Sequence, residues 1–247
     1  MKTVLQGLVA LAIFIVSSTA HGLTYTATNK TLSASATFTV SDLKLVITLS
    51  NTSSNDPSTS AQILTGIYFT LAGDPALTPT SALLGPDTVI KGRPGISGPG
   101  MNVGGEWAYR NDLPGLPHGA NEGISSTSLK KFTQHFRFPG PNLQGPAAPG
   151  GVQYGVTTAI DTMGNDKGNL KHQQLVENTV IFTLGGLPTN FTLADISNVS
   201  FQYGTSLKDA DVTGQSPGEV IPEPNTVALV VAGLLVAFAA TCRPAGR

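Results

Sequence analysis

Cysteine is almost missing from this chain, whose 247 residues include a single thiol, Cys242. One cysteine cannot form a disulfide within the chain, and no thiol is available for catalysis before residue 242. The fold must therefore be stabilised by the burial of apolar side chains and by hydrogen bonds.

Charge is scarce as well. Charged residues make up 12% of the sequence and the formal net charge is -1, whereas the usual charged share is about 25%. A protein that binds nucleic acid or an anionic lipid surface normally carries a basic patch. We therefore expect no nucleic-acid partner.

Motifs for metal binding and for cofactor binding are also lacking. The sequence contains no His-Glu-x-x-His zinc motif, no phosphate-binding loop and no dinucleotide-binding glycine fingerprint, and its four histidines are scattered. We predict a protein that is not an enzyme, with no catalytic residues, no metal and no cofactor. A secreted hydrolase is the alternative. It would need two carboxylates from among Glu106, Asp112 and Glu122 at the fixed separation that glycoside hydrolysis requires.

The N-terminus has the features of a secretory signal peptide. A positively charged start precedes a short apolar run, and Ser18 and Ala20 are small residues at the −3 and −1 positions of a cleavage site. We predict that residues 1–20 form a leader helix and that signal peptidase cuts between Ala20 and His21. The alternatives are cleavage after Gly22 and an uncleaved anchor, although the apolar run is shorter than a membrane span.

The C-terminus carries a second apolar segment. Residues 226–242 contain no charged side chain, and these 17 residues reach the lower end of the range of about 17–25 that spans a bilayer as a helix. Arg243 and Arg247 follow and would stay in the cytoplasm by the positive-inside rule, which leaves the preceding domain outside. We divide the remaining chain into an exported domain at 21–212 and a linker at 213–221.

Pro222, Glu223 and Pro224 stand just before this segment. The ordered set of tripeptide, apolar helix and terminal arginines resembles the PEP-CTERM sorting signal of Gram-negative bacteria. In that family a membrane-embedded cysteine peptidase, exosortase, recognises the tripeptide and processes the anchor. The resemblance implies that residues 222–247 are a sorting signal, although the two arginines are split by Pro-Ala-Gly where family members often end in a tight arginine cluster. A plain tail anchor behind a proline-rich linker is the alternative.

The resemblance also implies a location and partners. The family is associated with exopolysaccharide and biofilm, so we expect a non-enzymatic protein of the cell surface or extracellular matrix that passes through an inner-membrane intermediate. Its implied partners are signal peptidase, exosortase, the membrane through the C-terminal helix, and extracellular polysaccharide. Such tails are also labelled as the C-terminal domain of ice-binding proteins. An ice-binding protein would need a flat regular array of threonines, and Thr24, Thr26 and Thr28 form too short a run.

Period-two alternation dominates the exported domain. Apolar and polar residues alternate over 32–40 and again over 43–49, on either side of Ser41-Asp42, which predicts an antiparallel hairpin with one buried face. Further elements are predicted as strands at 63–71, 131–138, 152–160, 178–184 and 199–203, and as one helical turn at 192–197. Short strands without covering helices favour an all-β fold, an antiparallel β-sandwich of jelly-roll-like form.

The stretch 85–128 is rich in glycine and proline and shows no strand pattern. It contains the only tryptophan, Trp107, close to Tyr109 and Arg110. If these three residues are exposed, they are possible ligand contacts, because aromatic rings flanked by hydrogen-bonding groups stack on sugars. A carbohydrate-binding module that uses Trp107 and Tyr109 is therefore an alternative function. We favour the other interpretation, in which both rings pack as a lid over one end of the sandwich.

Export leads to a first prediction. N-terminal sequencing of the mature protein from an exporting host should begin at His21, because the −1 and −3 positions before it are small. Ala20→Leu should block this cut, whereas Thr19→Leu, at the more tolerant −2 position, should leave it in place. Recovery of a folded wild-type protein that retains Met1 would contradict the prediction.

Overall fold

Strands make up nearly all the regular structure of the described chain. The computed structural model describes residues 22–92, 98–112, 115–127, 138, 140–144, 151–161, 168–205 and 211–215. Within these residues there are thirteen β-strands and five short 3₁₀ helices. The helices are η1 Ser60–Gln62, η2 Gly104–Glu106, η3 Pro117–Gly119, η4 Gly168–Leu170 and η5 Leu193–Asp195. The predicted all-β class is therefore confirmed.

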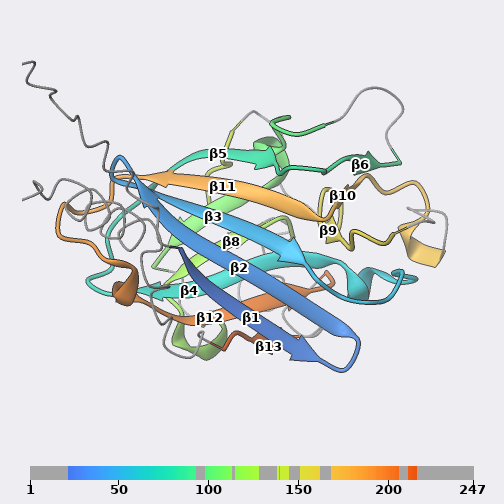
Figure 1. Cartoon of the computed structure of the whole chain (residues 1–247), viewed down its shortest axis with the longest axis horizontal. Coiled ribbons are helices and arrows are strands. Elements are labelled where there is room, and N and C mark those ends of the chain that lie inside the picture. Colours follow the sequence, from blue (N-terminus) through green and yellow to red (C-terminus); the bar gives the residue numbers. More distant parts are fainter. Residues whose placement is uncertain are drawn as a thin grey trace, which may run out of the picture. The chain divides into compact units, whose positions relative to one another are not determined.

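One sheet has five antiparallel strands in the order β1-β2-β3-β11-β5 (Figure 1). Its strands are β1 Leu23–Asn29, β2 Leu32–Ser41, β3 Lys44–Asn51, β5 Thr78–Leu84 and β11 Thr179–Gly185. β2 and β3 form the predicted hairpin, with Ser41 paired to Lys44. The turn residues are Asp42 and Leu43, one position later than predicted, and their φ angles are 51° and 57°. Two central residues at positive φ match the right-handed twist of a hairpin.

The second sheet has eight strands. Six lie in the order β13-β12-β4-β9-β10-β6, and the hairpin of β7 and β8 joins β4 through β8. Its strands are β4 Leu64–Leu71, β6 Ile90–Lys91, β7 Ala108–Asn111, β8 Glu122–Ser125, β9 Val156–Thr157, β10 Leu175–Glu177, β12 Ile196–Tyr203 and β13 Asp211–Thr213.

One pair in this sheet corrects the expectation that all strands are antiparallel. β9 and β10 run parallel, with Val176 opposite Val156. Parallel neighbours need a connection of about a dozen residues or more, and the chain between Thr157 and Leu175 is long enough. The sequence pattern did not reveal this pair because each strand is very short.

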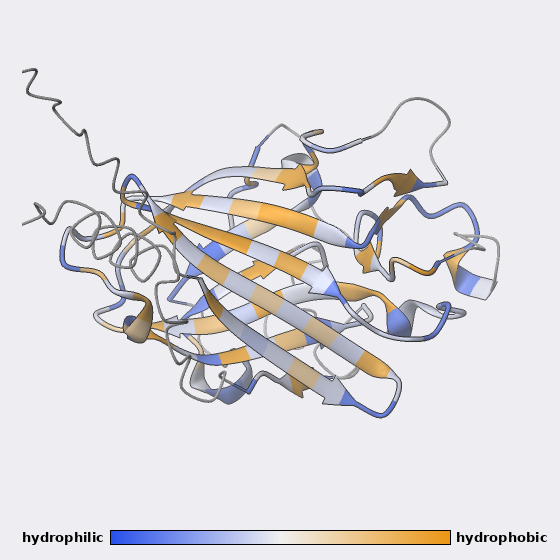
Figure 2. Ribbon diagram, viewed as in Figure 1, coloured by the Kyte–Doolittle hydropathy of each residue, from blue (hydrophilic) through white to orange (hydrophobic). Residues whose placement is uncertain are grey.

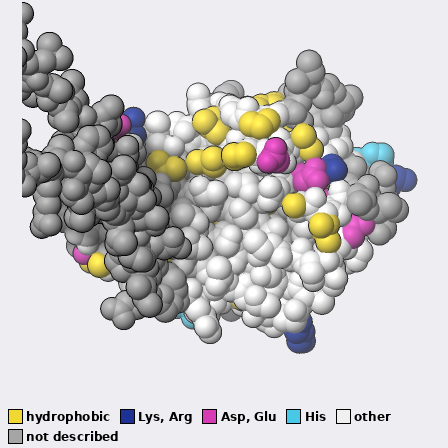
Figure 3. All heavy atoms as spheres, viewed as in Figure 1, with side chains coloured by type: hydrophobic (Ala, Val, Ile, Leu, Met, Phe, Trp, Pro, Cys, Tyr) yellow, Lys and Arg dark blue, Asp and Glu magenta, His cyan; other side chains and the backbone are white. Residues whose placement is uncertain are grey.

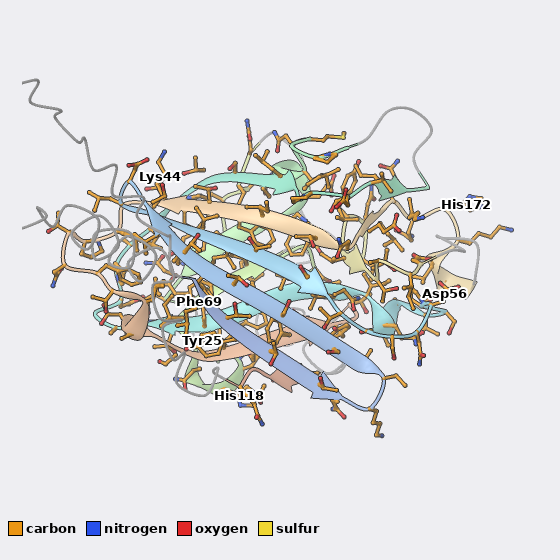
Figure 4. All side chains as sticks on the ribbon, in the orientation of Figure 1. Tyr25, Lys44, Asp56, Phe69, His118 and His172 are labelled. Carbon is orange, nitrogen blue, oxygen red and sulfur yellow. The ribbon has the colours of Figure 1, made fainter. Side chains whose placement is uncertain are left out.

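One hydrophobic core holds side chains from both sheets. Alternation turns Phe38 of β2 and Phe182 of β11 inward, and both are 0% exposed. The ring of Phe38 meets the ring of Phe69 from β4 edge to face, with 5.4 Å between centroids. Figure 4 labels Phe69. Burying a side chain of this size contributes about 1.5–3 kcal/mol. Figure 2 shows the same alternation as apolar and polar bands along β2, β3 and β11.

The two outer strands of the five-stranded sheet are paired with other backbone segments. At β1, the Thr26 N–H donates to the Gln215 carbonyl at 3.2 Å and the Gln215 N–H donates back at 2.8 Å. At β5, the Leu84 N–H donates to the Met101 carbonyl at 2.9 Å. Paired edges are protected from adding a strand of another chain. Gln215, which takes part in this pairing, lies in the segment predicted as the linker at 213–221.

The longer predicted strands are confirmed as β4, β11 and β12, which the sequence placed at 63–71, 178–184 and 199–203. The strand predicted at 152–160 is reduced to the two residues of β9. The helical turn predicted at 192–197 is η5, where the Asp195 carboxylate accepts from the Thr192 N–H at 2.8 Å. The strand predicted at 131–138 lies almost wholly outside the described residues.

The stretch 85–128 differs from the structureless loop that its composition predicted. It contains β6, β7, β8 and two 3₁₀ helices. β7 and β8 pair from Ala108 opposite Ser125 to Asn111 opposite Glu122, and β8 continues onto β4. Four-residue strands are too short for alternation to be visible, and their hydrogen bonds are decided by tertiary pairing.

The predicted leader at 1–20 and the predicted helix at 226–242 lie outside the described residues. Among the residues that are described, none belongs to a helix long and apolar enough to cross a membrane. By its contacts the chain divides into two compact units, Met1–Gln215 and Ser216–Arg247. All described residues belong to the first unit.

Candidate functional site

The residues singled out in the sequence fall into two groups. The first group lies outside the described part of the chain and comprises Ala20, His21, Pro222, Glu223, Pro224, Arg243 and Arg247. The second group consists of the possible ligand contacts Trp107, Tyr109 and Arg110, which lie at the start of the β7–β8 hairpin.

Trp107 follows η2 directly and is 0% exposed. Its ring packs on Phe182 of the other sheet, with 4.9 Å between centroids and an angle of 60°. The indole Nε1 is buried and has no hydrogen-bond partner among the described residues, which costs about 1–3 kcal/mol. The burial of the apolar ring surface against Phe182 stabilises the core and opposes the cost of the unpaired Nε1.

Tyr109 is also enclosed, at 2% exposure. Its hydroxyl donates to Glu122 Oε2 across the hairpin at 2.5 Å, whereas Arg110, between the two aromatic residues and the turn, is exposed. Two buried rings cannot stack on a sugar. The hypothesis of a carbohydrate-binding module built on Trp107 and Tyr109 is therefore wrong. Both rings are packed inside the protein, and a position over one end of a sandwich stays a prediction.

Glu122 is a buried carboxyl group, 0% exposed. Its pKa is raised to about 7, chiefly by burial and to a smaller extent by the negative charge of Asp74, while the hydrogen bond from Tyr109 opposes the rise. Its second oxygen, Oε1, has no partner among the described residues. Burial and the adjacent carboxylate also raise the pKa of the Tyr109 hydroxyl, so the tyrosine remains the proton donor of the pair.

The three carboxylates that a hydrolase would draw on lie in different surroundings. Glu122 is enclosed, Glu106 is half-buried at the end of η2, and Asp112 is exposed just after β7. Burial raises the pKa of Glu106. Because Glu122 is held inside by Tyr109, a substrate at the surface cannot reach it, which removes one of the three candidates for a catalytic pair.

A surface hollow of about 390 Å³ lies beside η1 and η4, with Glu106 in its wall. Its polar lining comprises Ser60, Glu106, Gln153, Asn169, Gln173 and Thr205. Asn169 holds Ser60 in place by accepting from its N–H at 3.0 Å and donating to its hydroxyl at 2.8 Å. Amides, hydroxyls and one carboxylate suit a small polar molecule or water. These residues are spread over the whole chain, so no local motif pointed to them.

A further polar contact fastens the last described strand. The Nε2 atom of His118 in η3 lies 2.8 Å from Asp211 Oδ2 and 3.2 Å from the Thr213 hydroxyl (Figure 4). Burial raises the pKa of Asp211, and His118 opposes that shift. β13 is therefore tied to the rest of the domain by side chains as well as by its pairing with β12.

Comparisons with known proteins identify no family for this chain. No protein-family model, no curated protein and no solved structure matches the chain. Among the described residues, no group of three or more histidine, cysteine, aspartate or glutamate residues is placed to hold a metal ion.

The position of Trp107 gives a stability prediction. Trp107→Ala should lower the free energy of unfolding by about 3–5 kcal/mol, because it leaves a cavity against Phe182. Ile160→Ala, at a side chain that is 51% exposed, should change it by about 0.5 kcal/mol or less. Urea denaturation of both variants and the wild type measures the difference. Equal, small losses would contradict the core position of Trp107.

Glu122 gives a pH prediction. Its folded-state pKa of about 7 lies above the ordinary value of 4.5, so the folded state binds the proton more tightly. The stabilisation is complete below about pH 4.5 and is lost as pH rises to about 7, by up to about 3 kcal/mol. Glu122→Gln, which cannot titrate, should flatten this part of the stability curve, whereas Asp112→Asn at an exposed position should keep the wild-type slope. A wild-type slope in Glu122→Gln, measured by denaturation between pH 4.5 and 7, would overturn this assignment.

Proposed function

We propose that this chain is an exported, non-enzymatic protein of the cell surface or extracellular matrix, sorted and processed by exosortase. The observation that carries the proposal is the order of features at the C-terminus. Pro222-Glu223-Pro224 stands before the uncharged segment 226–242, and Arg243 and Arg247 follow that segment. A plain anchor needs only apolar length and a basic flank, so the tripeptide is unexplained without a protease.

The N-terminal leader supports the same topology. Signal peptidase would remove residues 1–20, and the positive-inside rule would keep Arg243 and Arg247 in the cytoplasm. The domain would then pass through an inner-membrane intermediate to the cell surface or the medium.

The architecture that we propose for the exported domain is an antiparallel β-sandwich of jelly-roll-like form. Two sheets contribute to one core, which supports face-to-face packing. In the first sheet β11 lies between β3 and β5, far from both in sequence, as in folds with Greek-key connections. The parallel pair of β9 and β10 is a local departure from this plan.

The end of the folded domain is compatible with a processing site close behind it. Gln215 is paired with Thr26 of β1, and Pro222 follows seven residues later. Seven residues span at most about 25 Å. A peptidase would therefore meet a short tether between a folded domain and a membrane segment. The proline rings restrict φ and favour an extended chain at residues 221 and 223, which is the form in which proteases bind substrates.

A non-enzymatic role fits the buried position of Glu122. The same role agrees with the association of the resembled family with exopolysaccharide and biofilm. A secreted hydrolase is the weaker alternative, because Glu106 and Asp112 would have to act without Glu122.

The decisive variants are in the tripeptide. Glu223→Ala should leave membrane insertion intact but stop removal of the helix, because a protease reads this side chain and an anchor does not. Full-length protein should then accumulate in the membrane fraction of a host that has exosortase, while the wild type is released or transferred. Immunoblots of membrane and extracellular fractions measure both forms.

Glu219→Ala is the matched control, because it removes a carboxylate from the linker four residues earlier. Pro217→Ala serves in the same way for the paired variant Pro222→Ala with Pro224→Ala. The controls should be processed as the wild type is. If Glu223→Ala is processed equally well, the sorting proposal fails and a simple tail anchor remains.

A further inference from the structure

The outward side of the first sheet is built from hydroxyl side chains. In β1, β2, β3 and β11 the residues that alternate with the core are mostly serine and threonine. We define the hydroxyl face as Thr24, Thr26, Thr28, Ser33, Ser35, Thr37, Thr39, Thr48, Ser50, Thr179 and Thr183. Most of these side chains are half-buried or exposed. Figure 3 views this side of the molecule and shows a broad area without charged side chains over β1, β2 and β3.

The strand register aligns these hydroxyls in rows across the sheet. One row runs from Thr26 through Ser35 and Ser50 to Thr179. Neighbouring strands lie about 4.8 Å apart, and residues on one face repeat about every 6.8 Å along a strand. The face is therefore a two-dimensional array, which no single strand could provide.

Hydrogen bonds between neighbours fix the orientation of these side chains. Hydroxyl oxygens are 2.8 Å apart in the pair of Thr24 and Thr37 and 2.8 Å apart in the pair of Ser50 and Thr179. A hydroxyl has one proton and two lone pairs, so each bonded pair still offers acceptors and one donor to a ligand. Side chains that are already ordered lose little entropy when they bind.

The scarcity of charge selects the kind of ligand. Lys30 lies in the turn after β1, and Lys44, at the first position of β3, is the one charged residue that alternates with the core on the outward side of these four strands. A nucleic acid or an anionic polymer would need lysines or arginines there, and a stable protein partner would need a central cluster of apolar and aromatic side chains. A neutral polymer that carries many hydroxyls matches both donors and acceptors of the face.

Half-buried apolar side chains lie among the hydroxyls on the same side of the sheet. Ile181 lies opposite Thr48 on one side and Leu83 on the other, and Val46 lies between Thr39 and Thr183. A sugar ring has an apolar C–H surface beside its hydroxyl edge. The mixture of hydroxyl and apolar side chains on this side of the sheet matches these two sides of a sugar chain.

We propose that the hydroxyl face binds a neutral polysaccharide chain. This inference rests on the proposed function only in that export brings the protein to such a polymer.

The strands of a sheet twist by about 20–25° from one to the next, and Figure 1 shows β1 and β2 at a clear angle to β5. A twisted array touches a rigid crystal such as ice over a small area, whereas a flexible glycan can follow it.

The test is affinity electrophoresis of the full chain in detergent micelles through gels that contain hydroxyethyl cellulose, dextran or a galactomannan. The wild type should be retarded by at least one of these neutral polymers. Thr37→Val and Thr48→Val keep the shape and the strand preference of threonine but remove its hydroxyl. Each should weaken binding about fivefold, which corresponds to one net hydrogen bond. Thr37→Ser, which keeps the hydroxyl, should bind as the wild type does.

Thr70→Val is the matched control. Thr70 lies in β4 of the other sheet, where its hydroxyl accepts a hydrogen bond from Asn198, and it is not part of the hydroxyl face. It should bind as strongly as the wild type, and unfolding curves should show that all variants are folded. No retardation by any neutral polymer overturns the proposal, as does retardation by alginate alone. Adsorption to ice without polymer binding, or unchanged binding in Thr37→Val and Thr48→Val, overturns it too. Because processing at Glu223 is measured separately, failure here leaves the sorting proposal intact, and failure of sorting leaves this one intact.

Discussion

The packing of apolar side chains between the two sheets is the interaction on which the rest of this structure depends. With one cysteine at position 242, no disulfide can support the domain. Ring contacts that join the sheets, such as Phe38 with Phe69 and Trp107 with Phe182, therefore hold it together. The same packing explains why the only tryptophan serves the core and not a ligand, since a ring at this position fills the space beside β11.

Low charge shapes both the inside and the outside of the domain. Inside, a carboxyl group such as Glu122 is enclosed with one oxygen bonded to Tyr109, and its pKa rises accordingly. Outside, strands still need polar residues on the solvent side to alternate with the core. When few of these residues are charged, serine and threonine fill the positions, and threonine also suits strands because its side chain is β-branched. The hydroxyl face follows from that combination.

The ends of the domain connect the fold to the proposed sorting. Gln215 is paired with Thr26 in the first strand, and β13 is fixed by His118 through Asp211. The last described residues are thus part of the sheet system and not of a free linker. Pro222 follows Gln215 by seven residues in the sequence, which is consistent with the proposed processing of the tail by a membrane peptidase.

The sequence by itself determined the all-β class, the hairpin of β2 and β3, and the positions of β4, β11 and β12, because apolar residues at every second position are a local signal. The features of both chain ends on which the proposed sorting depends are also local in the sequence. Only the tertiary structure decided the β7–β8 hairpin, the parallel pair of β9 and β10, and the burial of Trp107. Those strands have two to four residues, which is too few for alternation to be visible, so their pairing depends on tertiary contacts. The hydroxyl rows depend on the same cause, because Thr26 and Thr179 become members of one array only when strand pairing brings them into register.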